Sequence, residues 1–148
     1  MTKILVTGGA GYIGSHAVRA LLDASYDVVV VDNLYKGVRG AVDSRAKFFE
    51  VDLADFDELN GIFSAEKVDA VMHFAGAIEV GESMKKPRFY MESNVIYGQN
   101  LLEVMRINGV NKIIFSSTAA VYGAPKVMSI GEDVEKNPTN IYGFSKLA

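Results

Sequence analysis

Five short apolar runs, separated by longer segments with helical periodicity, constrain the fold of this chain more than any other feature of its sequence. The runs are rich in β-branched or aromatic residues and lie at 3–7, 27–32, 47–51, 69–74 and 112–116. Near-continuous apolar runs are typical of parallel strands buried on both faces. Their order predicts an α/β fold with a five-stranded, doubly wound parallel sheet and right-handed crossovers.

The segments between the runs carry apolar residues at spacings of three and four. This periodicity predicts amphipathic helices over residues 12–25, 55–64 and 88–107. In the second of these, acidic residues occupy the first turn, where the helix dipole favours negative charge. The apolar face of the first helix is expected to comprise Ile13, Ala17, Ala20, Leu21 and Ala24.

Two further segments, residues 37–40 and 123–140, are predicted to be loops. The second contains Pro125 and Pro138, and a loop of that length is uncommon unless it is functional or disordered. A final helix is expected over residues 141–148, where the chain stops. Because so short a helix is not stable by itself, we expect this segment to be loosely held.

Composition narrows the class of protein. A length of 148 residues suits one domain with a core of its own. The net charge of −3 argues against nucleic acid or an anionic membrane as the main partner. Cysteine is absent, which excludes a disulfide scaffold and thiolate metal sites and fits a cytoplasmic location. No apolar run approaches the ~18 residues of a membrane span, and neither histidine has ligand-type neighbours, so no metal site is predicted.

Three glycines lie between the first predicted strand and the first predicted helix. Gly8, Gly11 and Gly14 have the spacing G-x-x-G-x-x-G. In dinucleotide-binding turns one glycine makes the tight turn, one lets the backbone approach a pyrophosphate, and one lets the helix pack on the strand. The N–H groups at the helix start then face the phosphates. The flanking strand and helix favour dinucleotide binding; the alternative is a tight turn without a ligand.

Asp32 ends the second predicted strand, 18 positions after Gly14. An acidic residue at about this distance hydrogen-bonds the ribose 2′-hydroxyl of a dinucleotide, and its charge would repel a 2′-phosphate. The cofactor is therefore predicted to be NAD and not NADP. The alternative is a strand-end aspartate that caps a turn. Asn33 and Leu34 follow where an adenine edge would lie.

Two more groups of residues follow predicted strands at the ligand side of such a sheet. Asp52 and Leu53 come after the third strand, and Phe74, Ala75 and Gly76 end the fourth. The small residues of the second group would allow the backbone to approach a cofactor closely. Simple turn chemistry is the alternative for both groups.

Tyr142 and Lys146 are four positions apart and therefore share one face of the last predicted helix. Free tyrosine has a pKa of ~10, but a nearby ammonium and a positively charged nicotinamide favour the phenolate, which can then accept a proton. Thr118, with Ser116 and Ser117, ends the fifth strand, where a hydroxyl could hydrogen-bond a reacting substrate oxygen. Taken alone, these residues could be a surface pair and a Ser/Thr turn. Together and in this order they favour proton transfer.

These residues resemble the UDP-glucose 4-epimerase family, a group of extended short-chain dehydrogenases/reductases with an NAD-binding Rossmann fold. The resemblance covers the whole chain, and family members are about twice as long. It implies that residues 1–148 are the NAD-binding domain of such an enzyme, truncated in the helix after strand five, without the C-terminal nucleotide-sugar-binding part. The motifs that carry it are TGGAGYIGSH (7–16), DNL (32–34), HFAG (73–76), VGES (80–83), SSTAAVYG (116–123) and YGFSK (142–146).

The resemblance implies NAD-dependent epimerisation at C4 of a UDP-hexose (UDP-glucose/UDP-galactose) through a 4-keto sugar, and a cytoplasmic homodimer that takes part in galactose metabolism. Tyr142 would be the base, Lys146 its modulator and a ribose ligand, and Thr118 the assisting hydroxyl. The cofactor-binding residues that it implies are Gly8, Gly11, Tyr12, Ile13, Gly14, Asp32, Asn33, Leu34, Asp52, Leu53, Phe74, Ala75, Gly76, Asn94, Tyr142 and Lys146.

Some positions depart from the family pattern. Ile78 stands where a lysine usually contacts the cofactor, Ser93 precedes Asn94 in place of a second asparagine, and Ile141 replaces a proline. Tyr97 and Gly98 also replace a usual glycine–threonine pair. Another nucleotide-sugar epimerase or a dehydrogenase of this family is therefore an alternative.

Related dehydratases carry acid and base carboxylates directly after the threonine, where this chain has Ala119 and Ala120. Alanine cannot move a proton, so elimination of water is disfavoured. A binding module without catalysis of its own is the remaining alternative. In a chain of this length the fifth strand and the 88–107 helix would expose apolar surface, so we expect association or poor solubility.

Overall fold

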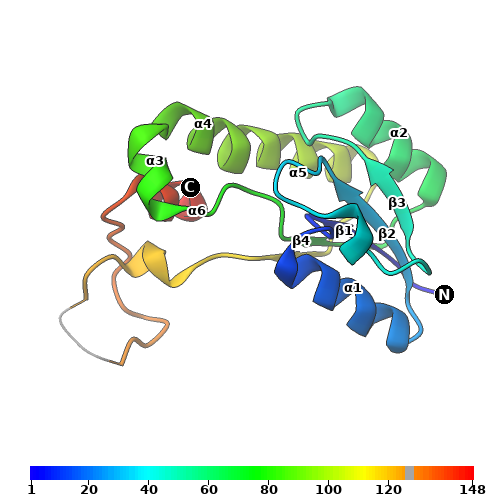
Figure 1. The fold of residues 1–148 in the computed structure, drawn as a ribbon, viewed down its shortest axis with the longest axis horizontal. Helices are drawn as coiled ribbons and strands as arrows, with labels where there is room; N and C mark the ends of the chain where they lie inside the picture. Colours follow the sequence, from blue (N-terminus) through cyan, green and yellow to red (C-terminus); the bar gives the residue numbers. More distant parts are fainter. Residues whose placement is uncertain (126–128) are drawn as a thin grey trace. The chain divides into compact units, whose positions relative to one another are not determined.

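The computed structural model describes residues 1–125 and 129–148. They form two compact units, which are described separately. The first comprises Met1–Ala75 and Gly98–Ser116, and the second comprises Gly76–Tyr97 and Ser117–Ala148. Figure 1 shows the path of the chain through both.

The first unit is built on a five-stranded parallel sheet with the order β3-β2-β1-β4-β5. The doubly wound α/β prediction is thus confirmed, and the observed strands lie within the predicted runs. Leu5 in β1 is aligned with Val29 in β2 and with Val71 in β4. The strands are β1 (Lys3–Thr7), β2 (Asp27–Asp32), β3 (Lys47–Glu50), β4 (Ala70–His73) and β5 (Ile113–Phe115).

Helices cover both faces of this sheet (Figure 1). Helix α1 (Tyr12–Asp23) lies on one face, and α2 (Phe56–Glu66) and α5 (Tyr97–Ile107) lie on the other. Asp55 begins α2 by accepting a hydrogen bond from the Glu58 N–H, and two acidic residues occupy its first turn, as expected. The two-sided cover explains why the central residues of β1 and β2 (4–6 and 28–31) are all apolar.

Burial follows position in the sheet. Leu5, Val6 and Val30 in the central strands are fully buried, as predicted. The prediction that all five runs are buried on both faces is wrong at the edges, since Ile114 in β5 is 61% exposed and β3 is only partly buried. An edge strand lacks a neighbour on one side. The separate expectation that the fifth strand exposes apolar surface is confirmed.

The apolar face of α1 differs from the prediction. Ile13 is 61% exposed, and Ala20 and Ala24 are also exposed, whereas Gly14 and Val18 are buried. A Cβ on Gly14 would lie 2.1 Å from the carbonyl oxygen of Gly8. The start of the helix therefore approaches the sheet through its smallest residue, a contact that a count of apolar spacings does not include.

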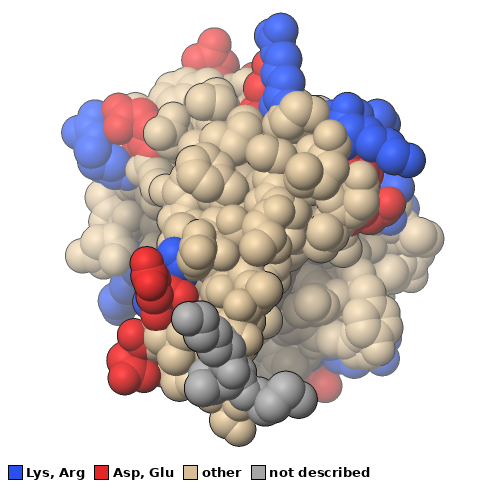
Figure 2. Space-filling view, turned by 90° about the vertical axis from the view of Figure 1, so that its left-hand side faces the viewer, with Lys and Arg blue, Asp and Glu red and all other residues tan. Residues whose placement is uncertain are grey.

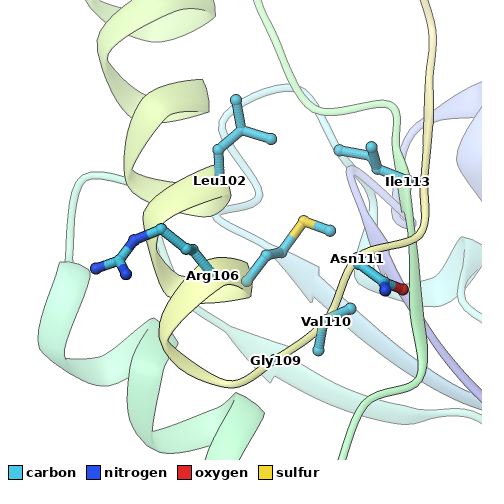
Figure 3. A pocket seen from close by; sticks show the side chains of 7 residues that line it. Leu102, Arg106, Gly109, Val110, Asn111 and Ile113 are labelled. Atoms are coloured by element: carbon cyan, nitrogen blue, oxygen red, sulfur yellow. The ribbon is translucent and has the colours of Figure 1, made fainter.

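An apolar hollow of about 350 Å³ lies between the end of α5 and the start of β5 (Figure 3). Leu102 and Ile113 border it. Since the strands are parallel, the hollow lies at the end of the sheet where the strands begin. The glycine turn, which follows β1, lies at the other end. The hollow therefore contributes to the exposed apolar surface of this unit and not to the nucleotide-type turn.

The second unit consists of short helical segments. The predicted helix over 88–107 is interrupted: α4 (Pro87–Met91) leads into a π-helical turn, η2 (Glu92–Ile96), before α5 begins at Tyr97. Apolar spacing does not detect a single wide turn. Helix α6 (Ile141–Leu147) is present as expected. Two segments were not predicted, α3 (Val80–Lys85) and the 3₁₀ helix η3 (Ala119–Tyr122).

The predicted loops agree with the structure in part. A 3₁₀ turn, η1 (Arg39–Ala41), overlaps the loop expected at 37–40. The described residues of the 123–140 segment contain no helix or strand; residues 126–128 lie outside the described part. Among the described residues no helix is long and apolar enough to cross a membrane.

Candidate functional site

The glycine turn after β1 is held by close backbone contacts. Gly8 has φ +72°, and a Cβ there would lie 2.5 Å from the amide nitrogen of Ala75. Gly11 donates its N–H to the Gly8 carbonyl at 3.1 Å and begins α1 without a side-chain cap. Gly14 closes the turn against the same carbonyl oxygen. The predicted roles of tight turn and close helix packing are therefore visible, and the start of α1 has no side chain of its own to cap it.

Tyr12 and Ile13, which were predicted to bind pyrophosphate, both have exposed side chains at the start of α1. The ring of Tyr12 packs edge-on against His16, with ring centroids 5.0 Å apart. Their backbone N–H groups belong to the first turn of the helix. Any contact with a phosphate at this point would therefore come from the backbone, with the side chains turned to solvent.

Asp32 is buried at the end of β2, and both of its carboxylate oxygens accept backbone hydrogen bonds. Oδ2 accepts the N–H of Ala10 at 2.9 Å, and Oδ1 accepts the N–H of Leu34 at 2.9 Å. Leu34 has φ +57°, an unusual conformation that the second bond supports. The turn-capping role considered for Asp32 is thus present. Each oxygen keeps a further lone pair, so the carboxylate can also accept a hydroxyl.

Asn33 and Asp52 form a polar pair at the same edge of the sheet. The Asn33 Nδ2 donates to Asp52 Oδ2 at 2.7 Å, and Asp52 Oδ1 accepts the N–H of Ala54 at 2.8 Å. Leu53 is buried, and its carbonyl accepts a hydrogen bond from the Asn100 side chain. The structure therefore brings together Asn33 and Asp52, two of the four residues predicted after β2 and β3.

Phe74 and Ala75 form the backbone against which Gly8 packs. A hydroxyl that sequence analysis did not single out supports them, because the Ala75 N–H donates to Thr7 Oγ1 at 3.4 Å. Thr7 Oγ1 also lies 2.6 Å from Nδ1 of His73, and both side chains are buried. The sequence did contain a signal for this pair, because Thr7 and His73 are polar residues at the ends of apolar strands. The pair fixes the ends of β1 and β4 beside the glycine turn.

Gly76, in the second unit, is where the chain turns after β4. A Cβ at this position would lie 2.7 Å from Asn94 Oδ1 and 3.3 Å from Lys146 Nζ. Asn94 is buried, accepts the Ala77 N–H with Oδ1 at 2.8 Å, and donates to the Ala77 carbonyl at 3.0 Å. Three predicted site residues therefore meet at one point, because Gly76 has no side chain.

Helix α6 carries Tyr142 and Lys146. Asn140 caps it by accepting the Gly143 N–H with Oδ1 at 2.8 Å. A Cβ on Gly143 would lie 2.6 Å from the Ala120 carbonyl oxygen, so the helix also packs closely on η3. The expectation of a loosely held segment rested on its length alone. The Asn140 cap and the packing on η3 are contacts that hold the helix in place.

Thr118 precedes η3 and caps it, with Oγ1 accepting the Ala120 N–H at 3.2 Å. Since Ala120 contacts Gly143, which directly follows Tyr142, the hydroxyl and the phenol belong to the same part of the second unit. Both side chains are half-buried. A half-buried hydroxyl can still form a hydrogen bond with a small molecule.

Lys146 is only 6% exposed, although it carries an ammonium. Burial disfavours the charged form and lowers the pKa of Lys146 from 10.5 to about 8. A lysine whose pKa lies near neutrality can hold or release a proton readily.

A second buried group in this unit, Tyr90, behaves differently. Its hydroxyl accepts the Glu79 N–H at 2.9 Å and donates to Glu82 at 3.1 Å. Burial, followed by the hydrogen bond to Glu82, raises the pKa of Tyr90 to about 12. It therefore stays protonated near neutral pH and holds α3 in place.

One face of the molecule, on the side of α3 and α6, is largely uncharged at its centre (Figure 2). The exposed apolar side chains of α3 and α6 include Val80, Met84, Phe144 and Leu147. A hollow of about 240 Å³ lies between α3 and the start of α6, lined by Met84, Phe144 and residues 138–141. Apolar patches of this kind mark contact surfaces. Among the described residues no group of three His, Cys, Asp or Glu side chains could hold a metal ion.

The sheet order and the glycine turn define a Rossmann-type α/β protein. The model of the NAD dependent epimerase/dehydratase family matches residues 4–148, and the chain belongs to this family. A UDP-glucose 4-epimerase of Lacticaseibacillus casei is 53% identical over 145 residues, which cover 98% of this chain and 44% of that protein. The chain therefore spans less than half the length of this relative.

Solved structures support the same family assignment. A crystal structure of a UDP-glucose 4-epimerase superposes with a TM-score of 0.97 at 51% identity, covering 99% of this chain and 44% of that one. The UDP-glucose 4-epimerase of Bifidobacterium longum, solved in complex with NAD+ and UDP, gives a TM-score of 0.95 at 41% identity, covering 99% and 46%.

Proposed function

We propose that this chain is the NAD-binding part of a UDP-hexose 4-epimerase. The observation that carries the proposal is the glycine turn, where Gly8 and Gly14 leave no room for side chains beside the buried carboxylate of Asp32. The reaction is proposed from the relatives, because proteins named UDP-glucose 4-epimerase match nearly the whole chain at 46–53% identity.

The chain's residues fit NAD in three places. The turn from Gly8 to Gly14, with Tyr12 and Ile13, would hold the pyrophosphate at the uncapped start of α1. Asp32 would accept a ribose hydroxyl with its remaining lone pairs and repel a 2′-phosphate. The residues proposed for the adenosine end are Asn33, Leu34, Asp52 and Leu53, and those for the dinucleotide backbone are Phe74, Ala75 and Gly76. Asn94 is a further proposed cofactor-binding residue.

NAD would supply a hydride acceptor and donor for C4 of the sugar. The chain's own residues would handle the proton. Tyr142 takes the proton of the O4 hydroxyl, Lys146 stabilises the phenolate and binds ribose, and Thr118 hydrogen-bonds the reacting oxygen. The hydride would return to the opposite face of C4 and the proton to O4, so that the configuration is inverted without net oxidation. The segment after Thr118 contains Ala119 and Ala120, which supports epimerisation over loss of water, since neither can act as acid or base.

We also propose that residues 1–148 are the NAD-binding domain of a longer cytoplasmic homodimer of galactose metabolism, whose remaining part binds the nucleotide sugar. The lengths of the relatives and the uncharged face of Figure 2 support this organisation. Light scattering tests the association of the chain. A monomer at all concentrations would contradict association of the chain.

The proposal is tested by denaturing the purified chain and identifying any released nucleotide by mass. We expect NAD, and NADP would contradict the role of Asp32. Conversion of UDP-galactose is then followed with NAD far below the substrate concentration. Turnover without consumption of NAD supports an epimerase, whereas stoichiometric reduction of NAD indicates a dehydrogenase. Bound NAD without turnover indicates a binding module that lacks catalysis by itself.

A further inference from the structure

Asn94 lies in the π-helical turn η2, and its carboxamide is used almost completely by the protein. Its oxygen accepts the Ala77 N–H, and one N–H donates to the Ala77 carbonyl. The second N–H donates to the hydroxyl of Ser145 at 2.9 Å. Both donors are therefore engaged within the second unit. π-Helical turns also occur frequently at functional sites.

Ser145 continues this connection into α6. It is buried, and its hydroxyl accepts from Asn94 and donates to the Tyr142 carbonyl at 2.8 Å. The residue lies three positions after Tyr142 and directly before Lys146. A hydroxyl with one donor and one acceptor bond has a fixed orientation. The turn at residues 76–77 is thus joined to the helix that carries the proton-transfer residues.

Gly76, with φ +148°, lies beside both Asn94 and Lys146. The space that its missing Cβ leaves is bordered by Asn94 Oδ1 and by Lys146 Nζ. The ammonium therefore lies against the backbone of the turn that Asn94 holds. A shift of α6 by a fraction of an ångström would change how deeply that ammonium is buried, because this part of the unit is closely packed.

We propose that Asn94 and Ser145 are a positioning pair, which fixes the turn at residues 76–77 to α6 and so sets the place of Tyr142 and Lys146 within the second unit. The role of the pair in turnover rests on the function proposed above. Neither residue moves a proton. The pair acts through Lys146, which directly follows Ser145 and whose Nζ lies beside Gly76.

The first test needs no substitution. The carboxamide protons of Asn94 should exchange with solvent at least about 100-fold more slowly than those of the exposed Asn33, because Asn94 is buried and doubly bonded. Exchange is measured by NMR on the unmodified chain. Equal exchange rates for the two asparagines would overturn the pair.

The second test compares two buried serines. Ser145→Ala removes the link between Asn94 and α6. Ser83→Ala is the matched control, since the Ser83 hydroxyl also donates to the carbonyl three residues earlier, at 2.6 Å, but in α3. The titration midpoint of Lys146 is followed by NMR of ¹³C-labelled lysine in the folded state. We expect it to move at least halfway from about 8 towards 10.5 in Ser145→Ala and to stay near 8 in Ser83→Ala.

Loss of stability alone does not move a titration midpoint of the folded state, so the result separates positioning from a general structural role. If Ser145→Ala does not fold, Ser145→Cys leaves no cavity and its thiol bonds only weakly, and a smaller rise in the midpoint is expected. Equal midpoints in the Ser145 variant and the Ser83 variant would overturn the proposal.

Affinity for NAD is then measured by calorimetry. Loss of one buried hydrogen bond should raise the Kd of Ser145→Ala about tenfold, with no change in Ser83→Ala. A chain that binds no NAD but shows the Lys146 shift contradicts the proposed function and supports the positioning of Lys146. A chain that binds NAD equally in both variants, with unchanged Lys146 titration, overturns the pair and leaves the proposed function intact.

Discussion

Replacing Lys146 with methionine should stabilise the chain at neutral pH. In the unfolded chain this lysine has an ordinary pKa, whereas burial lowers it to about 8 in the folded state. Below that pH the ammonium is buried at a cost. Since one pKa unit corresponds to about 1.4 kcal/mol, lowering the pKa from 10.5 to about 8 corresponds to roughly 3 kcal/mol. Methionine has a similar length and no charge, so Lys146→Met avoids this cost.

The pH dependence gives the sign of the effect. Between about pH 8 and 10.5 the unfolded chain binds more protons than the folded one at this position, so the stability of the unmodified chain rises with pH. The advantage of Lys146→Met should therefore be largest near pH 7, up to roughly 3 kcal/mol less the value of lost contacts, and should disappear by about pH 10.5.

The free energy of unfolding is measured by urea denaturation of both proteins across this range. Other groups titrate in both and cancel in the difference. Lys85→Met, on the exposed surface of α3, reports the effect of losing one exposed positive charge. A difference between Lys146→Met and the unmodified chain that stays constant from pH 7 to 10.5 would show that Lys146 is not desolvated.

Three other substitutions test separate features. Gly14→Ala should abolish NAD retention and lower the free energy of unfolding by more than about 2 kcal/mol, because its Cβ meets the Gly8 carbonyl. Gly61→Ala in α2, with open space around it, is the control and should stabilise the chain by up to about 1 kcal/mol in thermal unfolding. Asn140→Ala should cost about 1 kcal/mol by removing the cap of α6, seen as faster amide exchange at Gly143, and unchanged exchange would contradict the cap. Ile114→Glu, at the open edge of the sheet, should reduce self-association in light scattering without loss of fold, whereas unchanged association would place the contact elsewhere.

The parts of the fold that depend on local patterns could be predicted from the sequence. The central strands and the glycine turn follow from apolar runs and from residue spacing, and both have the predicted form. Contacts between distant residues could not be predicted. Ile13 fits the apolar period of α1 and is nevertheless exposed, because the helix meets the sheet through Gly14. Periodicity records which residues are apolar, but not the direction from which a helix approaches.

The candidate site shows the same division. Tyr142 and Lys146 are recognisable because four positions separate them on one helix. Ser145 lies between them, yet its partner Asn94 is 51 residues away and no spacing rule links the two. The π-helical turn that presents Asn94 is likewise invisible to apolar periodicity. Asn140, by contrast, had a local signal, since asparagine before a helical segment is a common cap.

The sheet order has a consequence for the way the chain folds. β1 pairs with β2, which follows closely, and with β4, whose His73 is 66 residues from Thr7. Closing the second pairing requires a much longer loop and is expected to be slower. Gly8 packs on Ala75 at the end of β4, so the glycine turn cannot reach its final shape until that strand docks. Pulse-labelling during refolding should therefore protect the Ala75 amide, whose acceptor is in β1, later than the Gly8 amide, which donates to Val31 in β2.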